Sequence, residues 1–314
     1  MNFPLVSVIC LCYNQGRFVT EAIESVIKQT YTNLQIIIVD DASADNSVAE
    51  IQKVVDKNPF IEFIALDKNH GNCKAFNIGW SRAKGDFIID FACDDIMLPD
   101  RIKRQVEFFQ ALDADYGVIF TDAVYVNEER KFLYNHIENL RHKKLLTHVP
   151  QGDVYTELIS TYFISSPTMM VRREVLESLH GYDETLAYED FDFWIRSSRL
   201  YKYAFLDEKL TLVRKSNASM STGWYKPGDP QLHSTYLICL KIRQLNRNVE
   251  ENESLIKRVR YELRQSVFSS NRKEAKLFFE LLAELNDVNL MDRIIYWLGK
   301  ISFPLAYVHK TFQR

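Results

Sequence analysis

Two pairs of adjacent carboxylates are the residues of this chain best suited to chemistry. Asp94 and Asp95 follow the apolar run Asp86–Phe91, and Glu189 and Asp190 stand much later in the sequence. Carboxylate oxygens at the end of a strand suit a hard divalent cation that bridges a diphosphate. A second carboxylate could accept the proton of an attacking hydroxyl. Together the pairs predict group transfer from a nucleotide-activated donor.

Each pair also has an ordinary structural explanation. Asp94 and Asp95 could form a solvated turn before a helix that begins at Pro99. Glu189 and Asp190 open a predicted helix, where the helix dipole stabilises acidic side chains. Against the first explanation, two adjacent carboxylates after a buried strand repel each other unless a cation or a hydrogen-bond donor compensates.

Alternating strand and helix patterns surround the first pair. Apolar, β-rich runs predict strands, and amphipathic spacing predicts helices between them. The predicted strands are residues 5–11, 34–39, 60–66, 86–91 and 116–126, and the predicted helices are 17–29, 43–57, 71–83 and 99–112. Such alternation is typical of a mostly parallel sheet flanked by helices. Ligands bind such sheets at the carboxyl ends of the strands, which brings Tyr13, Asp40, Asp41, Asp94 and Asp95 to one crevice.

Four further charged residues have two interpretations each. A carboxylate of Asp40 or Asp41 could accept an N–H from a nucleotide base, or the pair could form a turn and helix cap with Ser43. Lys74 and Arg214 are candidate phosphate partners, although isolated basic residues are usually solvated surface charges.

The second half of the chain has a weaker pattern. Residues 131–165 predict loops and short elements, and residues 167–171 predict a strand. A helix is predicted at 189–200, and short strands at 203–205 and 210–213. From about residue 231 the chain has helical spacing, after a Pro/Gly cluster near residue 225. The predicted organisation is therefore a catalytic domain of residues 1–225 and a helical extension of residues 226–314.

Bulk composition limits the class of protein. The chain has 314 residues, 46% hydrophobic and 26% charged, and a net charge of −3, which argues against nucleic-acid binding through a basic surface. Five cysteines without ligand-like spacing are expected to be reduced core residues of a cytoplasmic protein. No secretory signal and no apolar run of membrane-spanning length is evident.

The order of several motifs resembles the family 2 glycosyltransferases, which have the Rossmann-like GT-A fold of nucleotide-diphospho-sugar transferases. The resemblance covers roughly residues 4–220 and includes Ser7–Asn14, Ala22–Tyr31, Ile37–Asp45, Asn69–Gly71, Ala83–Asp86, Asp94–Asp95, Leu98–Ile102, Gly181–Glu184 and Glu189–Arg196. It implies an inverting transfer from a nucleotide-diphosphate donor, most commonly a UDP-sugar, to a hydroxyl in polysaccharide or lipid-linked glycan synthesis.

Motif matches assign residue roles. Leu11, Tyr13, Asp41 and Asp94 would bind the nucleotide, with Tyr13 stacked on the base. Asp94, supported by Asp95, would hold Mn²⁺ or Mg²⁺ on the diphosphate. Asp190 would be the general base, and diphosphate or acceptor contacts would come from Lys74, Glu189 and Arg214.

Two positions depart from the family pattern. Ala92 stands where the family usually has the first acid of its metal motif, and Ser216 stands where many relatives have a histidine. The first departure puts strict metal dependence in doubt. It also supports an alternative hypothesis, a degenerate protein that binds a nucleotide sugar or a partner without turnover. A nucleotidyltransferase would need a Gly-rich basic loop after the first strand, and this chain has none there.

The end of the chain is apolar and basic. Apolar residues recur at near-helical spacing at Ile294, Trp297, Leu298, Ile301, Leu305, Val308 and Phe312, and no acid follows Asp292. An interfacial helix near a lipid-linked acceptor, at the inner face of the membrane, would explain the pattern. Packing on the catalytic domain or on a second subunit is the other explanation, and Pro304, which breaks the helical pattern, favours it.

Overall fold

The computed structural model describes residues 3–215 and 225–300. These residues divide into two compact units. The first unit comprises residues 3–154, 163–185 and 192–215, and the second comprises residues 155–162, 186–191 and 225–300. The predicted amphipathic run beyond residue 300 and the predicted departure at Ser216 lie outside the described residues.

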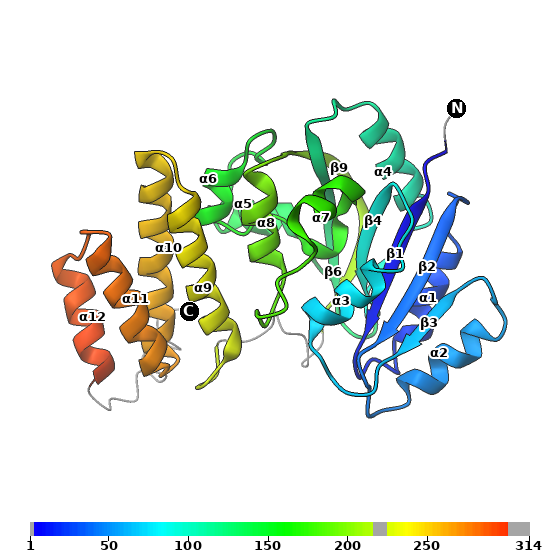
Figure 1. Cartoon of the computed structure of the whole chain (residues 1–314), viewed down its shortest axis with the longest axis horizontal. Coiled ribbons are helices and arrows are strands. Elements are labelled where there is room, and N and C mark those ends of the chain that lie inside the picture. Colours follow the sequence, from blue (N-terminus) through cyan, green and yellow to red (C-terminus); the bar gives the residue numbers. More distant parts are fainter. Residues whose placement is uncertain (1–2, 216–224, 301–314) are drawn as a thin grey trace. The chain divides into compact units, whose positions relative to one another are not determined.

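The first unit is built on one sheet (Figure 1). Its strands are β1 (Val6–Cys12), β2 (Leu34–Asp40), β3 (Glu62–Ala65), β4 (Phe87–Ala92), β5 (Ile96–Met97), β6 (Tyr116–Val126), β7 (Phe132–Asn135), β8 (Met170–Arg172) and β9 (Lys202–Arg214). Across the described residues the order is β3-β2-β1-β4-β8-β6-β9-β5, with β7 paired to β6. The pairs β3-β2, β2-β1, β1-β4 and β6-β9 are parallel, whereas β4-β8, β8-β6, β6-β7 and β9-β5 are antiparallel. The predicted α/β sheet flanked by helices is confirmed, but it is mixed, and the parallel strands predicted from the alternating pattern are concentrated in β3-β2-β1-β4.

Helices flank this sheet on both faces. They are α1 (Val19–Ile27), α2 (Ser47–Val55), α3 (Asn72–Trp80), α4 (Arg101–Gln110), α5 (His136–His142) and α7 (Arg173–Leu179), with a 3₁₀ turn at Ser166–Thr168. Alternate residues of β1, such as Val8 and Cys10, join one apolar core with buried residues of α1, α2 and α4. On the other face α3 crosses so closely that a Cβ on Gly79 would lie 2.5 Å from the side chain of Ile9.

Two stretches differ in detail from the sequence prediction. The two short strands predicted near the end of the sheet are one strand, β9, because its pairing with β6 continues through an irregular stretch beside Thr121 and Asp122. Residues 131–165 contain β7, α5 and α6 (Tyr155–Ser160). All five cysteines are free and buried, as expected for core residues.

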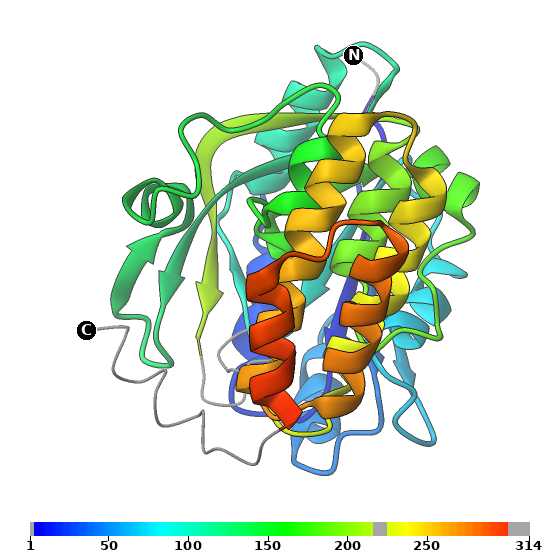
Figure 2. The ribbon, with the colours of Figure 1, turned by 90° about the vertical axis from the view of Figure 1, so that its left-hand side faces the viewer.

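The second unit is helical (Figure 2). Besides α6 it contains α9 (Pro230–Leu245), α10 (Val249–Phe268), α11 (Arg272–Glu284) and α12 (Leu290–Lys300). Its α10 packs against α6, α9, α11 and α12. Helix α8 (Asp190–Ser198) begins in this unit, and the chain returns to the first unit after Phe191. Within the described ranges, no helix has both the length and the hydropathy needed to cross a bilayer.

Candidate active site

The register of the parallel strands brings the predicted nucleotide-site residues to one edge of the sheet. Cys12 pairs with Asp40 across β1 and β2, and Leu11 pairs with Ala92 across β1 and β4. The residues that follow each strand therefore leave the sheet at the same edge. Leu11 itself is buried, whereas Tyr13, just beyond β1, is 49% exposed and available for stacking.

Side-chain and backbone hydrogen bonds join the first two loops at this edge. Asp40 is fully buried and accepts hydrogen bonds from the backbone N–H and the hydroxyl of Ser43, at 2.8 and 2.6 Å. The Ser43 hydroxyl accepts from the Asn14 N–H at 2.8 Å. Asp40 thus performs the turn role predicted for this acidic pair, and it fixes the backbone beside Tyr13.

Asp41 holds the backbone that directly precedes α3. Its two carboxylate oxygens accept the backbone N–H groups of His70 and Gly71, at 2.7 and 2.8 Å. Gly71 has a φ of 86°, in the left-handed region that favours glycine, and it directly precedes α3. A carboxylate has further lone pairs, so these bonds leave acceptor capacity on Asp41 for a nucleotide base.

The Asp94–Asp95 turn is fixed by Arg214, the last residue of β9. The pairing of Ile96 with Leu212 brings Arg214 beside the turn. Its backbone N–H donates to Asp95 Oδ1 at 2.8 Å, and its Nε donates to the carbonyl of Asp94 at 2.8 Å. The acidic turn is therefore held by two donors from one residue.

The remaining contacts of Arg214 are also with the protein. Its guanidinium donates to the Glu128 carbonyl and to Glu21 Oε2, each at 2.8 Å, and lies 4.4 Å from the ring centre of Phe18. Arg214 is only 4% exposed. The contact with phosphate or acceptor predicted for it stays a prediction, and the described contacts give it a part in shaping the turn.

Burial sets the electrostatics of the turn. It raises the pKa of Asp94, and the nearby Arg214 charge partly opposes this. It raises the pKa of Asp95 still more strongly, because the Asp94 charge acts in the same direction. Positive charge beside this turn is therefore stabilising, as expected for two neighbouring carboxylates.

Arg101 is a buried countercharge that the sequence analysis did not single out. It is fully buried, and its charge lowers the pKa of Asp95 against the effect of burial. Its Nε donates to Gln105 at 3.1 Å, and its Nη2 donates to the Met169 carbonyl at 3.2 Å. In the sequence, the feature that could have indicated this role is a basic residue at the start of the predicted helix that follows the acidic turn.

The carboxylate oxygens at the turn would suit a metal ion that is also coordinated by the phosphates of a bound substrate. No group of three or more His, Cys, Asp or Glu side chains able to hold a metal occurs in the part of the chain that the structure describes. Asp94 is half-buried, Asp95 is 3% exposed, and Ala92 has no ligand atom. Mg²⁺ is usually held by one or two carboxylates together with substrate phosphates and water, and such an arrangement needs only Asp94 with support from Asp95.

Lys74 lies on α3, beside the segment 181–184. Its Nζ is 3.7 Å from Glu184 Oε2, and both side chains are more than two-fifths exposed. Asn77 on the same helix exchanges two hydrogen bonds with the backbone of Tyr182, each 2.9 Å long. The Tyr182 hydroxyl donates to Asp90 at 3.1 Å. This helix thus links the loop held by Asp41 to the chain that leads toward the second acidic pair.

The second acidic pair belongs to the helical unit. Glu189 and Asp190 are half-buried, and Asp190 is the first residue of α8. Two residues further on, Asp192 pairs with Arg196 at 2.6 Å. The predicted nucleotide and metal residues thus lie in the first unit, and the predicted base lies in the second.

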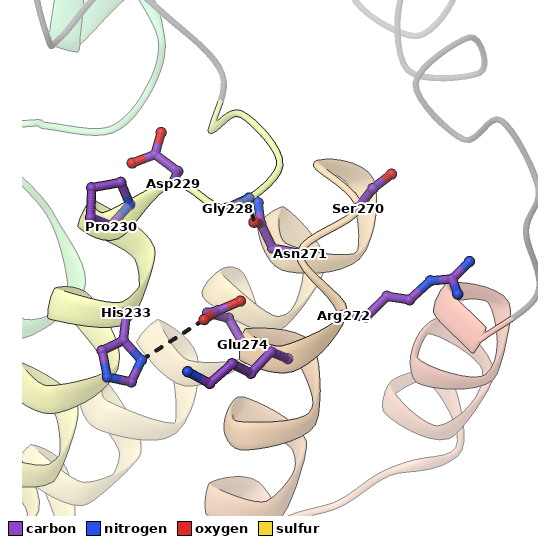
Figure 3. Close-up of a pocket in the computed structure, with 9 residues that line it drawn as sticks. Gly228, Asp229, Pro230, His233, Ser270, Asn271, Arg272 and Glu274 are labelled. Atoms are coloured by element: carbon purple, nitrogen blue, oxygen red, sulfur yellow. Dashed lines mark hydrogen bonds and ion pairs between the residues drawn. The ribbon is translucent and has the colours of Figure 1, made fainter.

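The helical unit also contains a surface pocket of about 440 Å³ (Figure 3). It is lined by residues 228–230, His233 and residues 270–274, and His233 lies 3.8 Å from Glu274. None of the predicted site residues lines it.

Comparison with known proteins agrees with this architecture. The sequence profile of glycosyl transferase family 2 matches residues 7–179. An uncharacterized glycosyltransferase of Haemophilus influenzae is 27% identical over 72% of this chain and 85% of its own length. One of Rickettsia felis is 30% identical over 77% of this chain, but the match spans only 37% of that longer protein.

Solved structures share the fold. The crystal structure of S. aureus TarS 1-349 in complex with UDP-GlcNAc superimposes with a TM-score of 0.65 and 20% identity, over 90% of this chain and 80% of that one. Mannosyltransferase PcManGT from Pyrobaculum calidifontis, in complex with GDP-Man and Mn²⁺, gives a TM-score of 0.63 and 13% identity, over 98% and 87%. The chain belongs to glycosyl transferase family 2, has the GT-A fold and is a glycosyltransferase.

Proposed function

We propose that the protein transfers a sugar, with inversion, from a UDP-sugar to an acceptor hydroxyl in polysaccharide or lipid-linked glycan synthesis. The observation that carries the proposal is the acidic turn Asp94–Asp95, which Arg214 holds by two hydrogen bonds at the carboxyl edge of parallel strands, with the charge of Arg101 opposing the effect of burial on Asp95. The same edge presents Tyr13 and Asp41, suited to the base of a nucleotide. Complexes of structural relatives with UDP-GlcNAc and with GDP-Man and Mn²⁺ support a nucleotide-sugar donor.

The proposed chemistry divides the work between the two acidic motifs. Asp190 accepts the proton of the acceptor hydroxyl while that oxygen forms its bond to the anomeric carbon. The bond from this carbon to the diphosphate oxygen breaks on the opposite side, and the diphosphate leaves with the electron pair. Mn²⁺ or Mg²⁺ on Asp94 would supply Lewis-acid stabilisation of that diphosphate. Lys74 adds a positive charge at the end of α3 nearer to Gly71.

A screen of nucleotide sugars by thermal shift, with and without Mn²⁺, tests the donor assignment. Binding to the folded state raises Tm, and we expect the largest shift for one UDP-sugar with metal present. Asp190→Asn should lower kcat by about 10²–10⁴-fold while leaving the donor-induced shift intact. Exposed Asp207, changed to Asn, is the matched control and should keep full activity. Loss of donor binding together with activity in Asp190→Asn would contradict the role as base.

Ala92 favours one alternative, a protein that binds a nucleotide sugar or a partner without turning it over. The two functions differ in a simple measurement. A transferase hydrolyses or transfers the donor that stabilises it in a metal-dependent reaction, whereas a binding protein shows the stabilisation alone. Sustained release of UDP by the wild-type protein, absent in Asp190→Asn, would exclude the alternative.

We also propose that the protein works at the cytoplasmic face of the membrane. The observation in support is the outer face of α12, where Leu290, Met291, Ile294 and Trp297 are 43–74% exposed. The acid of this helix, Asp292, is buried and paired with Arg260 at 3.0 Å. Exposed Arg293 and Lys300 thus add positive charge beside the apolar residues, a combination suited to an anionic lipid surface.

A further inference from the structure

The short segment 186–191, which carries Glu189 and Asp190, packs with the C-terminal helices. Two residues just before the acidic pair are attached to neighbouring positions of α9. The Ala187 N–H donates to the hydroxyl of Ser234 at 2.8 Å, and the Tyr188 hydroxyl lies 2.7 Å from Thr235 Oγ1. Ser234 is 4% exposed and Thr235 is fully buried, so both contacts are shielded from water.

The direction of the bond between Tyr188 and Thr235 follows from the rest of the network. The Thr235 hydroxyl donates its proton to the Gln231 carbonyl, one helical turn earlier, at 3.0 Å. It therefore accepts from Tyr188, whose phenol is the donor. Burial raises the pKa of Tyr188 well above its ordinary value, which keeps that proton in place.

The residue just after the acidic pair is attached to the same group of helices. Phe191 is fully buried, with its ring centre 5.1 Å from the guanidinium of Arg258 on α10 and 4.9 Å from the ring of Tyr162. Arg258 is itself fixed, because its Nε donates to the Ile159 carbonyl at 2.8 Å and its Nη1 lies 3.2 Å from Glu262. The acidic pair is thus held on both sides in the sequence.

We propose that Thr235 is a positioning residue of the transferase. Through Tyr188 it fixes the backbone that presents Asp190, so the C-terminal helices take part in the geometry of catalysis. This inference rests on the proposed role of Asp190 as general base. A base must lie within hydrogen-bond reach of the proton it accepts, and a displacement of about 1 Å can lower a rate about 100-fold.

The decisive variant is Thr235→Val, which keeps the shape of the side chain and removes the acceptor for Tyr188. We expect kcat to fall roughly 10- to 100-fold while KM for the donor changes less than about twofold. Thr235→Ser restores the hydroxyl and should recover most of kcat. If Tyr188 and Thr235 act through one contact, Tyr188→Phe combined with Thr235→Val should be no worse than the more impaired single variant.

Ser266→Ala is the matched control. Like Thr235, Ser266 is buried in the helical unit, and it donates to the carbonyl one turn earlier, that of Glu262, at 2.7 Å. Ser266→Ala should lose a similar amount of thermal stability and keep kcat. Equal losses of kcat in Ser266→Ala and Thr235→Val, or full kcat in Thr235→Val, would overturn the proposal.

Asp190→Asn, measured in parallel, separates the role of Asp190 as the base from the role of Thr235 in positioning it. If Asp190→Asn is inactive and Thr235→Val is fully active, Asp190 keeps its role and Thr235 does not position it. If Asp190→Asn retains full transfer, the assignment of the base is wrong, and the positioning role fails with it.

Discussion

Arg214 meets the acidic turn with both its backbone and its side chain. The backbone N–H donates to Asp95 Oδ1 and Nε donates to the Asp94 carbonyl, each at 2.8 Å. A residue at the far end of β9 thus fixes a turn about 120 positions earlier in the sequence. The metal-binding geometry proposed for Asp94 depends on this contact.

Arg214→Ala should therefore impair both stability and donor binding. The substitution leaves the carbonyls of Asp94 and Glu128 without the donor on Arg214 and removes a buried positive charge that faces the carboxylates. We expect a loss of about 3 kcal/mol in the free energy of unfolding, measured by urea denaturation, and a weaker metal-dependent thermal shift with the donor.

Arg17→Ala is the control for this prediction. Arg17 also lies over the Phe18 ring and pairs with Glu128, but its side chain is 60% exposed. Its removal should change stability by less than about 0.5 kcal/mol. Similar losses in the two variants would show that the contacts of Arg214 with the turn carry no special weight.

Asp94→Asn should separate stability from function. Burial raises the pKa of Asp94 in the folded state, so between the unfolded and folded pKa values the folded protein binds more protons than the unfolded protein. Stability from this group is therefore lost as the pH rises through that window. Asp94→Asn removes the buried charge and should raise the Tm of the ligand-free protein at neutral pH. This gain in Tm should shrink as the pH falls toward the ordinary pKa of an aspartate, because the wild-type carboxyl is then protonated and uncharged as well.

The same variant should lose the stabilisation that Mn²⁺ gives in the presence of a donor. Exposed Asp113, changed to Asn, controls for the general effect of one negative charge. A lower Tm for Asp94→Asn at neutral pH, with metal-dependent stabilisation intact, would contradict both parts of the prediction.

Asp41→Asn tests whether Asp41 binds the donor or only supports the loop before α3. The amide keeps one acceptor oxygen, but its NH₂ group would face an N–H of His70 or Gly71, which costs about 1–3 kcal/mol. If Asp41 also binds the base, KM for the donor should rise more than roughly tenfold.

Gly71→Ala disturbs the same loop without touching a carboxylate, because alanine is strained at a φ of 86°. It should lower stability comparably and raise KM for the donor less than about threefold. Equal increases of KM in Gly71→Ala and Asp41→Asn would assign the effect of Asp41 to loop structure alone.

The sequence was sufficient for the parallel half of the sheet. The strands β1, β2 and β4 are predominantly apolar, so both their extent and the edge that carries Tyr13, Asp41 and Asp94 could be predicted. In contrast, β9 was predicted as two fragments, because residues 207–209 are charged and interrupt the apolar pattern.

Long-range contacts were beyond the reach of sequence patterns. The bonds from segment 186–191 to α9 join residues 47 positions apart and have no local signal. Arg258 and Glu262 have the spacing of a solvated helical ion pair, yet they are 5% and 1% exposed. The partners of Arg214 likewise become evident only when β9 is paired with β5 and β6.

The apolar outer face of α12 leads to the last prediction. In sedimentation with phosphatidylcholine vesicles that contain phosphatidylglycerol, the wild-type protein should pellet with the lipid, and less so with phosphatidylcholine alone. Ile294→Ser combined with Trp297→Ser should weaken binding roughly tenfold or more, because two exposed apolar side chains lose their contact with the membrane interface. Higher salt should also weaken binding, since Arg293 and Lys300 contribute charge.

Phe132→Ser is the control for this pair, because Phe132 is 62% exposed on β7 of the other unit. It should leave vesicle binding unchanged. The competing occupant of the α12 face is a second copy of the chain, for which sedimentation velocity would show a concentration-dependent dimer that the double variant abolishes. If the protein forms such a dimer and pellets equally with and without anionic vesicles, the α12 face serves self-association and the membrane proposal is wrong.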